Sequence, residues 1–189
     1  LNNLAYIAGK LGLNTKELVT QFVEAADVIN VSMGDVLGDD ATLAIGKMAD
    51  VYKRTSETLE EKDLKGQLLS IGSAVNELGQ SSSANEAYMV NFAGRLGGIA
   101  VQAKLSADQI LGYASALDQD MQKVEMSATA FQKLIQKIIS KPADFAKIAG
   151  VELKEFNRLI REDMNGAIKS VLKGFQGSGG FAQLLPLFK

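Results

Sequence analysis

Pairs of carboxylates are the residues of this sequence whose type and spacing best suit chemistry. Two carboxylates that flank a sugar bond can act as general acid and nucleophile in a glycosidase. An aromatic sugar-binding pattern is missing, because the chain has no Trp and only four Tyr. Exposed helix surface explains the pairs better, since charged side chains are seldom buried. The pairs are Asp39/Asp40, Glu60/Glu61, Asp118/Asp120, Glu152/Glu155 and Glu162/Asp163.

Other catalytic and metal chemistry is limited by composition. Without His and Cys, the chain cannot form a Cys/His zinc site, a Ser-His-Asp or Cys-His nucleophile, a thiol redox centre or a disulfide. Residues 35–40 lack the alternating ligands and closing Glu of a calcium loop. Residues 94–98 are rich in Gly but have neither the Lys-Ser/Thr ending nor the preceding strand of a phosphate loop, so close helix packing is expected there. We expect no enzyme, no cofactor and no metal site.

Composition fits a folded chain rather than a disordered one. The 189 residues are 47% apolar and 22% charged, with a net charge of −2. This charge argues against a general nucleic-acid binder. Residues 12–18 have a residue pattern typical of a DNA-binding helix-turn-helix. The second helix of this pattern, however, exposes Glu17, Glu24 and Asp27 where a recognition helix needs basic or amide side chains. No uncharged apolar run reaches the roughly 18–20 residues of a membrane helix. Neither a specific nucleic acid nor a membrane is an expected partner.

Hydrophobic periodicity predicts an all-α fold. Apolar residues recur every three or four positions almost throughout, and only two Pro interrupt the chain. We expect stacked helical hairpins that form a bundle of about eight to ten helices. The expected helices lie near 3–11, from 16 to a break at 34–40, 43–52, 64–78, 84–103, 107–124, 128–139, 142–149, 152–161 and 165–175.

Several helix ends carry recognisable signals. Gly12 and Gly79 are expected to end their helices, and Asn14 or Thr15 to cap the second one. Ser106-Ala-Asp-Gln109 reads as a capping box, and Ser127 as the cap of the next helix. Residues 94, 97 and 98 are Gly within a helical pattern, where either a neighbour packs closely or the helix bends. Residues 55–65 read as a solvated connection or the polar start of a helix.

The expected domain organisation follows from the net charge of successive segments and from the positions of Pro and Gly. We expect a main helical domain at 1–140, a small helical subdomain at 141–176, and a flexible joint that leads into a next segment at 177–189. Net charge changes from −5 over 1–80 to 0 over 81–140 and +3 over 141–189. Helix-turn-helix units near 4–54 and 84–139 are similar, either by duplication or because such units look alike. Since the chain begins with Leu and ends mid-pattern, we expect an internal fragment of a longer protein.

One apolar stripe is a candidate protein interface. Its residues share one helical face, and such stripes usually fill a core or a subunit contact. They are Phe131, Leu134, Ile135, Ile138 and Ile139.

An ordered series of segments resembles the core region of phage tail tape-measure proteins. It covers residues 4–175, nearly the whole chain, and its order and spacing carry the match, since no single motif is diagnostic. The connection at 55–65 is longer and more charged than this family leads us to expect. The segments are Leu-Gly-Leu-Asn-Thr-Lys-Glu-Leu at 11–18 and those at 25–28, 45–50, 71–79, 82–86, 93–96, 105–112 and 146–150.

The resemblance implies a structural role in a phage or prophage. Proteins of this family lie in the lumen of the tail tube, determine tail length during virion assembly in the host cytoplasm, and leave the tail ahead of the DNA. Their partners are the tail tube protein, tail assembly chaperones and tail-tip or baseplate proteins, and self-association is a further expectation. Two alternatives remain: a cell-wall hydrolase-associated segment of the same large protein, and a generic helical adaptor that self-associates.

Overall fold

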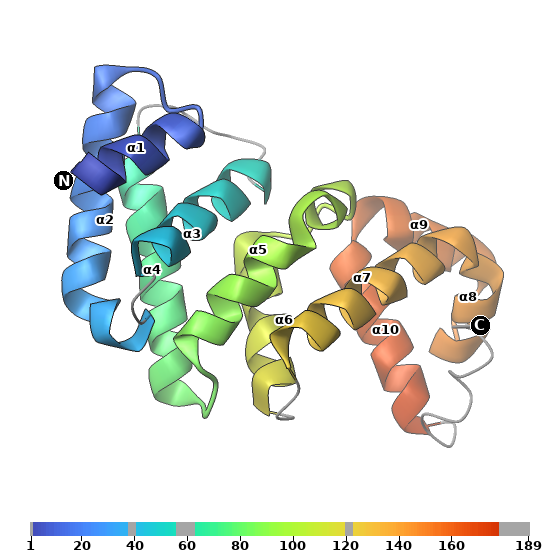
Figure 1. Cartoon of the computed structure of the whole chain (residues 1–189). Helices are drawn as coiled ribbons and strands as arrows, with labels where there is room; N and C mark the ends of the chain where they lie inside the picture. Colours follow the sequence, from blue (N-terminus) through green and yellow to red (C-terminus); the bar gives the residue numbers. More distant parts are fainter. Residues whose placement is uncertain (1, 38–40, 56–62, 120–122, 178–189) are drawn as a thin grey trace. The chain divides into compact units, whose positions relative to one another are not determined.

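The computed structural model describes residues 2–37, 41–55, 63–119 and 123–177. Within these ranges the chain forms ten α-helices and no strand (Figure 1). The expected all-α helical bundle is therefore confirmed. The helices are α1 (Asn2–Lys10), α2 (Lys16–Leu37), α3 (Ala41–Thr55), α4 (Leu64–Ser81), α5 (Glu86–Gln102), α6 (Ala107–Gln119), α7 (Val124–Ser140), α8 (Pro142–Ala149), α9 (Leu153–Glu162) and α10 (Met164–Gly177).

Several predicted helix ends are confirmed at the level of single hydrogen bonds. Gly12 follows α1 with a φ of 75°, a left-handed conformation that suits glycine. The Thr15 hydroxyl oxygen accepts a hydrogen bond from the Leu18 backbone N–H at 3.2 Å, so Thr15 caps α2. In the capping box, the Ser106 and Gln109 side chains each accept from the backbone N–H of the other residue, at 3.3 and 3.1 Å.

Two predicted helix ends are wrong, since α2 and α4 each continue past the glycine that was expected to end them. The break expected at 34–40 does not interrupt α2, which continues through Gly34 to Leu37. Met33 and Leu37 are buried and extend its core stripe, and this outweighs a penalty of about 1 kcal/mol for one Gly. Similarly, α4 continues past Gly79 to Ser81, and the Ser82 backbone N–H donates to the Leu78 carbonyl.

The predicted cap at Ser127 is also wrong. Helix α7 begins at Val124, so Ser127 lies one turn inside it and is buried. The helix predicted over 107–124 is divided, because α6 ends at Gln119 and Val124 belongs to α7.

The glycines of α5 produce a bend rather than a close helix contact. Gly97 has φ 43° and ψ −124°, which interrupts the helical geometry and suits glycine alone. A Cβ added at Gly97 or Gly98 would meet no atom within 4 Å, and one at Gly94 would make only ordinary contact with the Lys47 side chain. Of the two expectations for this segment, the bend is confirmed and close packing is not.

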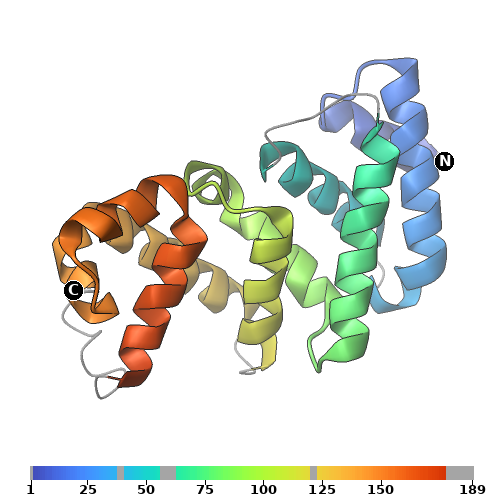
Figure 2. The same cartoon turned by 180° about the vertical axis from the view of Figure 1, so that it is seen from behind.

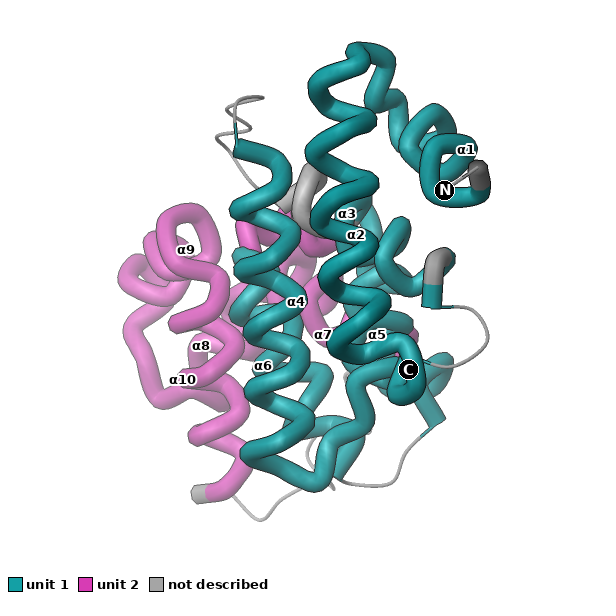
Figure 3. The backbone as a smooth tube through the Cα atoms, turned by 90° about the vertical axis from the view of Figure 1, so that its left-hand side faces the viewer, with its two compact units in different colours: residues 1–98, 106–128 teal, residues 99–105, 129–189 magenta. Residues whose placement is uncertain are grey.

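The chain divides into two compact units (Figure 3). Unit 1 contains residues 1–98 and 106–128, and unit 2 contains residues 99–105 and 129–189. This division differs from the boundary expected at residue 140, because unit 2 also takes the last residues of α5 and most of α7. The change of unit within α5 follows directly after the bend at Gly97.

Unit 1 is built around the pair α2 and α4, which lie side by side in both views (Figures 1 and 2). Helices α1 and α3 also pack on α2, whereas α6 packs on α4 and α3. The two helix-turn-helix units expected near 4–54 and 84–139 thus differ in packing, and their duplication stays a prediction. The largest fully buried side chains of unit 1 include Phe22, Ile29, Leu68 and Phe92.

In unit 2, α8, α9 and α10 pack on one another. All three were expected, with bounds within two residues. Pro142 begins α8, where its missing N–H costs nothing, and Gly150 ends it with a φ of 66°. Phe145, Phe156, Ile168 and Val171 are fully buried. Of the joint expected at 177–189, only Gly177 is described, as the last residue of α10. Of the connection at 55–65, residues 56–62 also lie outside the described part.

Candidate interaction surfaces

Of the five described carboxylates from the candidate acid–base pairs, two accept backbone hydrogen bonds at the start of a helix. The Asp118 carboxylate accepts a hydrogen bond from the Asn85 backbone N–H at 2.5 Å, just before α5. Asp163 accepts one from the Gly166 N–H at 2.9 Å and so caps α10. Glu152 is the first flanking residue of α9. Asp39, Asp40, Glu60, Glu61 and Asp120 lie outside the described residues.

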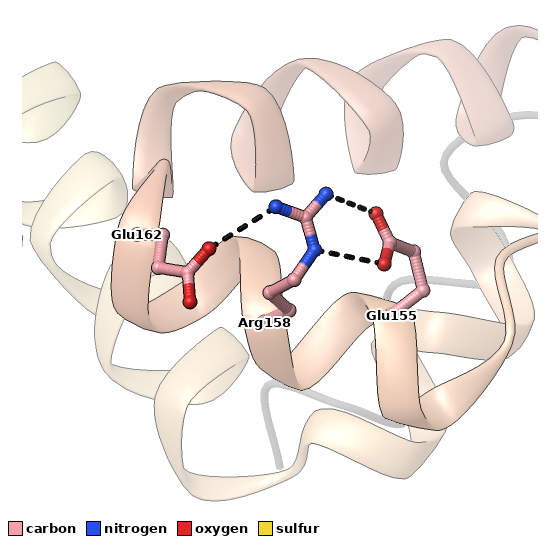
Figure 4. Close-up of polar contacts among 3 residues, drawn as sticks. All are labelled: Glu155, Arg158 and Glu162. Carbon is pink, nitrogen blue, oxygen red and sulfur yellow. Dashed lines mark hydrogen bonds and ion pairs between the residues drawn. The ribbon is translucent and has the colours of Figure 1, made fainter.

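Glu155 and Glu162 share one cation, Arg158, on the exposed side of α9 (Figure 4). Arg158 donates to both Glu155 oxygens, from Nη2 at 2.6 Å and Nε at 2.9 Å, and to Glu162 from Nη1 at 3.1 Å. The hydrogen bond and positive charge of Arg158 hold the pKa of Glu155 below its ordinary value. The hydrogen bonds that Arg158 donates to both glutamates raise the pKa of Arg158. This arrangement is an exposed ion-pair cluster, and the lowered pKa of Glu155 does not suit a general acid.

Metal and membrane binding find no support in the described part of the chain. No three carboxylates there gather in an arrangement that could hold a metal ion. Among the same residues, no helix is both long and apolar enough to cross a bilayer.

Three polar atoms in the described ranges are buried without a hydrogen-bond partner. They are Gln67 Oε1 on α4, the Tyr88 hydroxyl on α5 and Ser127 Oγ on α7. Such groups cost free energy and sometimes mark functional sites. Each of these three belongs to a different helix, and none has a titratable partner that would make it reactive.

The predicted interface on α7 is largely covered. Phe131, Ile135 and Ile138 are buried, Leu134 is half-buried, and Ile139 is 37% exposed. Three of the five side chains therefore fill a core. Self-association through this stripe stays a prediction, and it would require these side chains to become uncovered.

The two units differ more in net charge than do the three sequence segments 1–80, 81–140 and 141–189. Unit 1 carries nine cationic and seventeen acidic side chains, a net charge of −8, and unit 2 carries eleven and five, a net charge of +6. The trend from −5 to +3 along the sequence indicated this asymmetry only in part. Lys104, Lys133 and Lys137 belong to the basic unit although they precede residue 141.

One exposed face in each unit combines its charge with apolar side chains. On α2, this acidic face comprises Glu24, Asp27, Val28, Val31 and Asp35, which lie on one side of the helix. On α10, the basic face comprises Lys169, Leu172, Lys173 and Gln176, which also lie on one side of the helix. The sequence analysis predicts neither face, because spacing alone does not show which apolar side chains stay exposed.

The chain was compared with known families, curated proteins and solved structures. No family model matches it, and no curated protein or solved structure shows significant similarity to it. Its function has to be argued from its own residues.

Proposed function

We propose that this chain is a structural, non-enzymatic segment of a phage tail tape-measure protein. The observation that carries the proposal is the ordered series of segments over residues 4–175 that resembles the core region of that family. Three residues of the series, Thr15, Ser106 and Gly150, lie at helix ends. This supports their interpretation as helix junctions, while the order and spacing of the segments carry the resemblance.

In this role the segment lies in the lumen of the tail tube, after assembly in the host cytoplasm. It contributes to tail length, to tail assembly and to genome delivery. Its partners are the tail tube protein, tail assembly chaperones and tail-tip or baseplate proteins. The lack of His and Cys in the sequence agrees with a structural role, since it excludes the Ser-His-Asp and Cys-His nucleophile systems.

If the segment acts as a molecular ruler, its number of residues determines how much it adds to the length of the tail. A helix rises about 1.5 Å per residue, so 189 residues in one continuous helix would span about 280 Å. The longest helix in the described ranges, α2, has 22 residues and so spans about 33 Å. For a segment drawn out as one helix, about 280 Å is therefore the change in tail length that its loss should cause.

The proposal is tested by measuring tail length in a phage whose parent gene carries an in-frame deletion of this segment. Electron microscopy should reveal tails shortened by up to about 280 Å. A matched control replaces the segment with an unrelated helical sequence of equal length. If the segment acts only as a ruler, this replacement restores the tail length.

Tails of full length after the deletion would contradict a ruler role. Absence of tails would instead assign the segment to assembly or initiation. Lysis of cell-wall material by the purified chain in a zymogram would contradict the non-enzymatic part of the proposal.

A further inference from the structure

We infer that copies of this chain associate head to tail, with the acidic face on α2 of one copy against the basic face on α10 of another. The inference is independent of the proposed tail function. It rests on exposure, charge and spacing at two helix faces, each described within its own unit.

The acidic face of α2 contains apolar side chains that the fold leaves uncovered. Val31 is 83% exposed and Val28 is 49% exposed. Helices α1, α3 and α4 pack on α2, whose buried residues lie on the opposite side from these valines and include Phe22, Ile29 and Met33. A β-branched residue on an exposed helix face gains no packing and is a weaker helix former than Ala. Two of them in adjacent turns form a small apolar contact that a partner could cover.

Acidic side chains surround these valines. Glu24, Asp27 and Asp35 are exposed at positions that share the helix face with Val28 and Val31. Glu24 pairs with Lys65 at 2.8 Å. Within the described part of the chain, Asp27 and Asp35 have no ion-pair partner. The face therefore fits a partner with a central apolar side chain and cations on either side of it.

The basic face of α10 has these features. Leu172 is 41% exposed, and Lys169 and Lys173 flank it on the same side of the helix. Neither lysine has an ion pair among the described residues. Helices α8 and α9 pack on α10, through a side that includes the buried Ile168 and Val171.

Charge complementarity, both of the whole units and of the two faces, identifies the partner as a second copy of this chain. The units carry −8 and +6, so a second copy approaches with its opposite unit by long-range attraction. Val28 and Val31 of the acidic face then pack against Leu172 of the basic face and bury apolar area between the paired charges. Every copy has one face of each kind, so the contact is heterologous and can extend into short linear chains. A nucleic acid fits less well, because unit 1 of the same chain would repel it.

The test is sedimentation velocity over a concentration series at about 50 mM and about 500 mM NaCl, which bracket weak and strong screening. The wild-type chain should associate at low salt, and its apparent Kd should weaken at least about tenfold at high salt. Two variants, Lys169→Glu/Lys173→Glu and Asp27→Lys/Asp35→Lys, should each remain monomeric. Their equimolar mixture should associate, because one supplies an intact α2 face and the other an intact α10 face.

A matched control separates the α10 face from net charge. Lys133→Glu/Lys147→Glu makes the same change of charge in unit 2 at two exposed lysines of α7 and α8, and it should keep most of the association. Circular dichroism verifies that all variants keep their helix content.

Three results would overturn the inference. The first is a wild-type chain that stays monomeric at both salt concentrations. A frictional ratio that changes with salt while the mass remains that of a monomer counts as the same result. The second is association that neither salt nor either face variant weakens. The third is a monomer that binds a labelled DNA duplex and loses that binding with Lys169→Glu/Lys173→Glu, which would assign the basic face to nucleic acid.

Discussion

In unit 1, α2 and α4 meet where Gly72 of α4 faces a side chain, whereas in unit 2, α8 and α10 meet where Gly174 of α10 faces backbone. A Cβ added at Gly72 would lie 3.0 Å from Cγ1 of Ile29. A Cβ added at Gly174 would overlap the carbonyl oxygen of Ile148. Both glycines permit close approach of two helices, but the neighbouring atoms differ in how far they can move to accept an added methyl group.

This difference indicates where each unit tolerates change. An Ile side chain can shift by a few tenths of an ångström or change rotamer. A carbonyl within α8 cannot move without the whole short helix. The contact between α8 and α10 therefore depends on one missing methyl group, while the contact between α2 and α4 depends on side chains that can repack.

The largest effects should come from truncation of one fully buried aromatic side chain in each unit. Phe156→Ala in unit 2 and Phe22→Ala in unit 1 each remove a side chain that is 0% exposed. Each should lower the free energy of unfolding by about 3–5 kcal/mol. Native-state hydrogen exchange measures which amides lose protection, and we expect the loss to be confined to the unit that carries the substitution.

Equal loss of protection in both units would contradict this expectation. It would mean that the whole chain unfolds as one cooperative system. Leu172→Ala, at an exposed position of α10, serves as the control and should change stability little.

Alanine at the two contact glycines tests the comparison directly. Gly174→Ala should destabilise unit 2 by about 1–3 kcal/mol, because backbone must move. At Gly72, the gain in helix propensity of about 1 kcal/mol offsets the adjustment of Ile29, so Gly72→Ala should change stability by less than about 1 kcal/mol. Urea denaturation gives both values. A larger loss at Gly72 than at Gly174 would reverse the assignment of rigid and adaptable contacts.

A smaller effect should be shared by the two units, since each contains the same N-cap. Asp63 accepts a hydrogen bond from the Gly66 N–H at 3.2 Å and caps α4, and Asp163 does the same with Gly166 at the start of α10. Asp63→Ala and Asp163→Ala should each cost about 1 kcal/mol. Asparagine at either position should restore most of the loss, because its side-chain oxygen also accepts. If Asn behaves like Ala, the carboxylate charge matters more than the hydrogen bond.

The sequence predicted helices well wherever a local signal and the apolar period agreed. The capping box at Ser106, the cap at Thr15 and the end of α8 at Gly150 are local hydrogen-bonding devices that need no tertiary partner. Gly34, Gly79 and Ser127 carry similar local signals, yet all three lie inside helices. Around Gly34 and Ser127 burial of neighbouring residues decides, and burial depends on contacts that are distant in the sequence. Burial does not account for the continuation of α4 past Gly79, because Leu78 is half-buried and Gln80 and Ser81 are exposed.

The candidate surfaces were less predictable, for the same physical reason. Spacing alone places Leu172 and Ile168 on one apolar helix, but only packing distinguishes the exposed Leu172 from the buried Ile168. The same holds for Phe131 and Ile139 on α7. Charge was visible in the sequence, yet the bend at Gly97 and the division of α7 decide which lysines belong to the basic unit.

The smallest effect should be at the ion-pair cluster on α9, and it concerns pH. Arg158 lowers the pKa of Glu155, so the folded state holds the Glu155 carboxylate more readily than the unfolded state does. The stabilisation is present above the ordinary glutamate pKa of about 4.3 and is lost as the pH falls through the lower folded value. Carboxyl-detected NMR should find Glu155 titrating below that ordinary value, and Arg158→Gln should return its pKa toward it. Because the pair is exposed, added salt should reduce the shift. A Glu155 pKa that Arg158→Gln leaves unchanged would assign the shift to another part of unit 2.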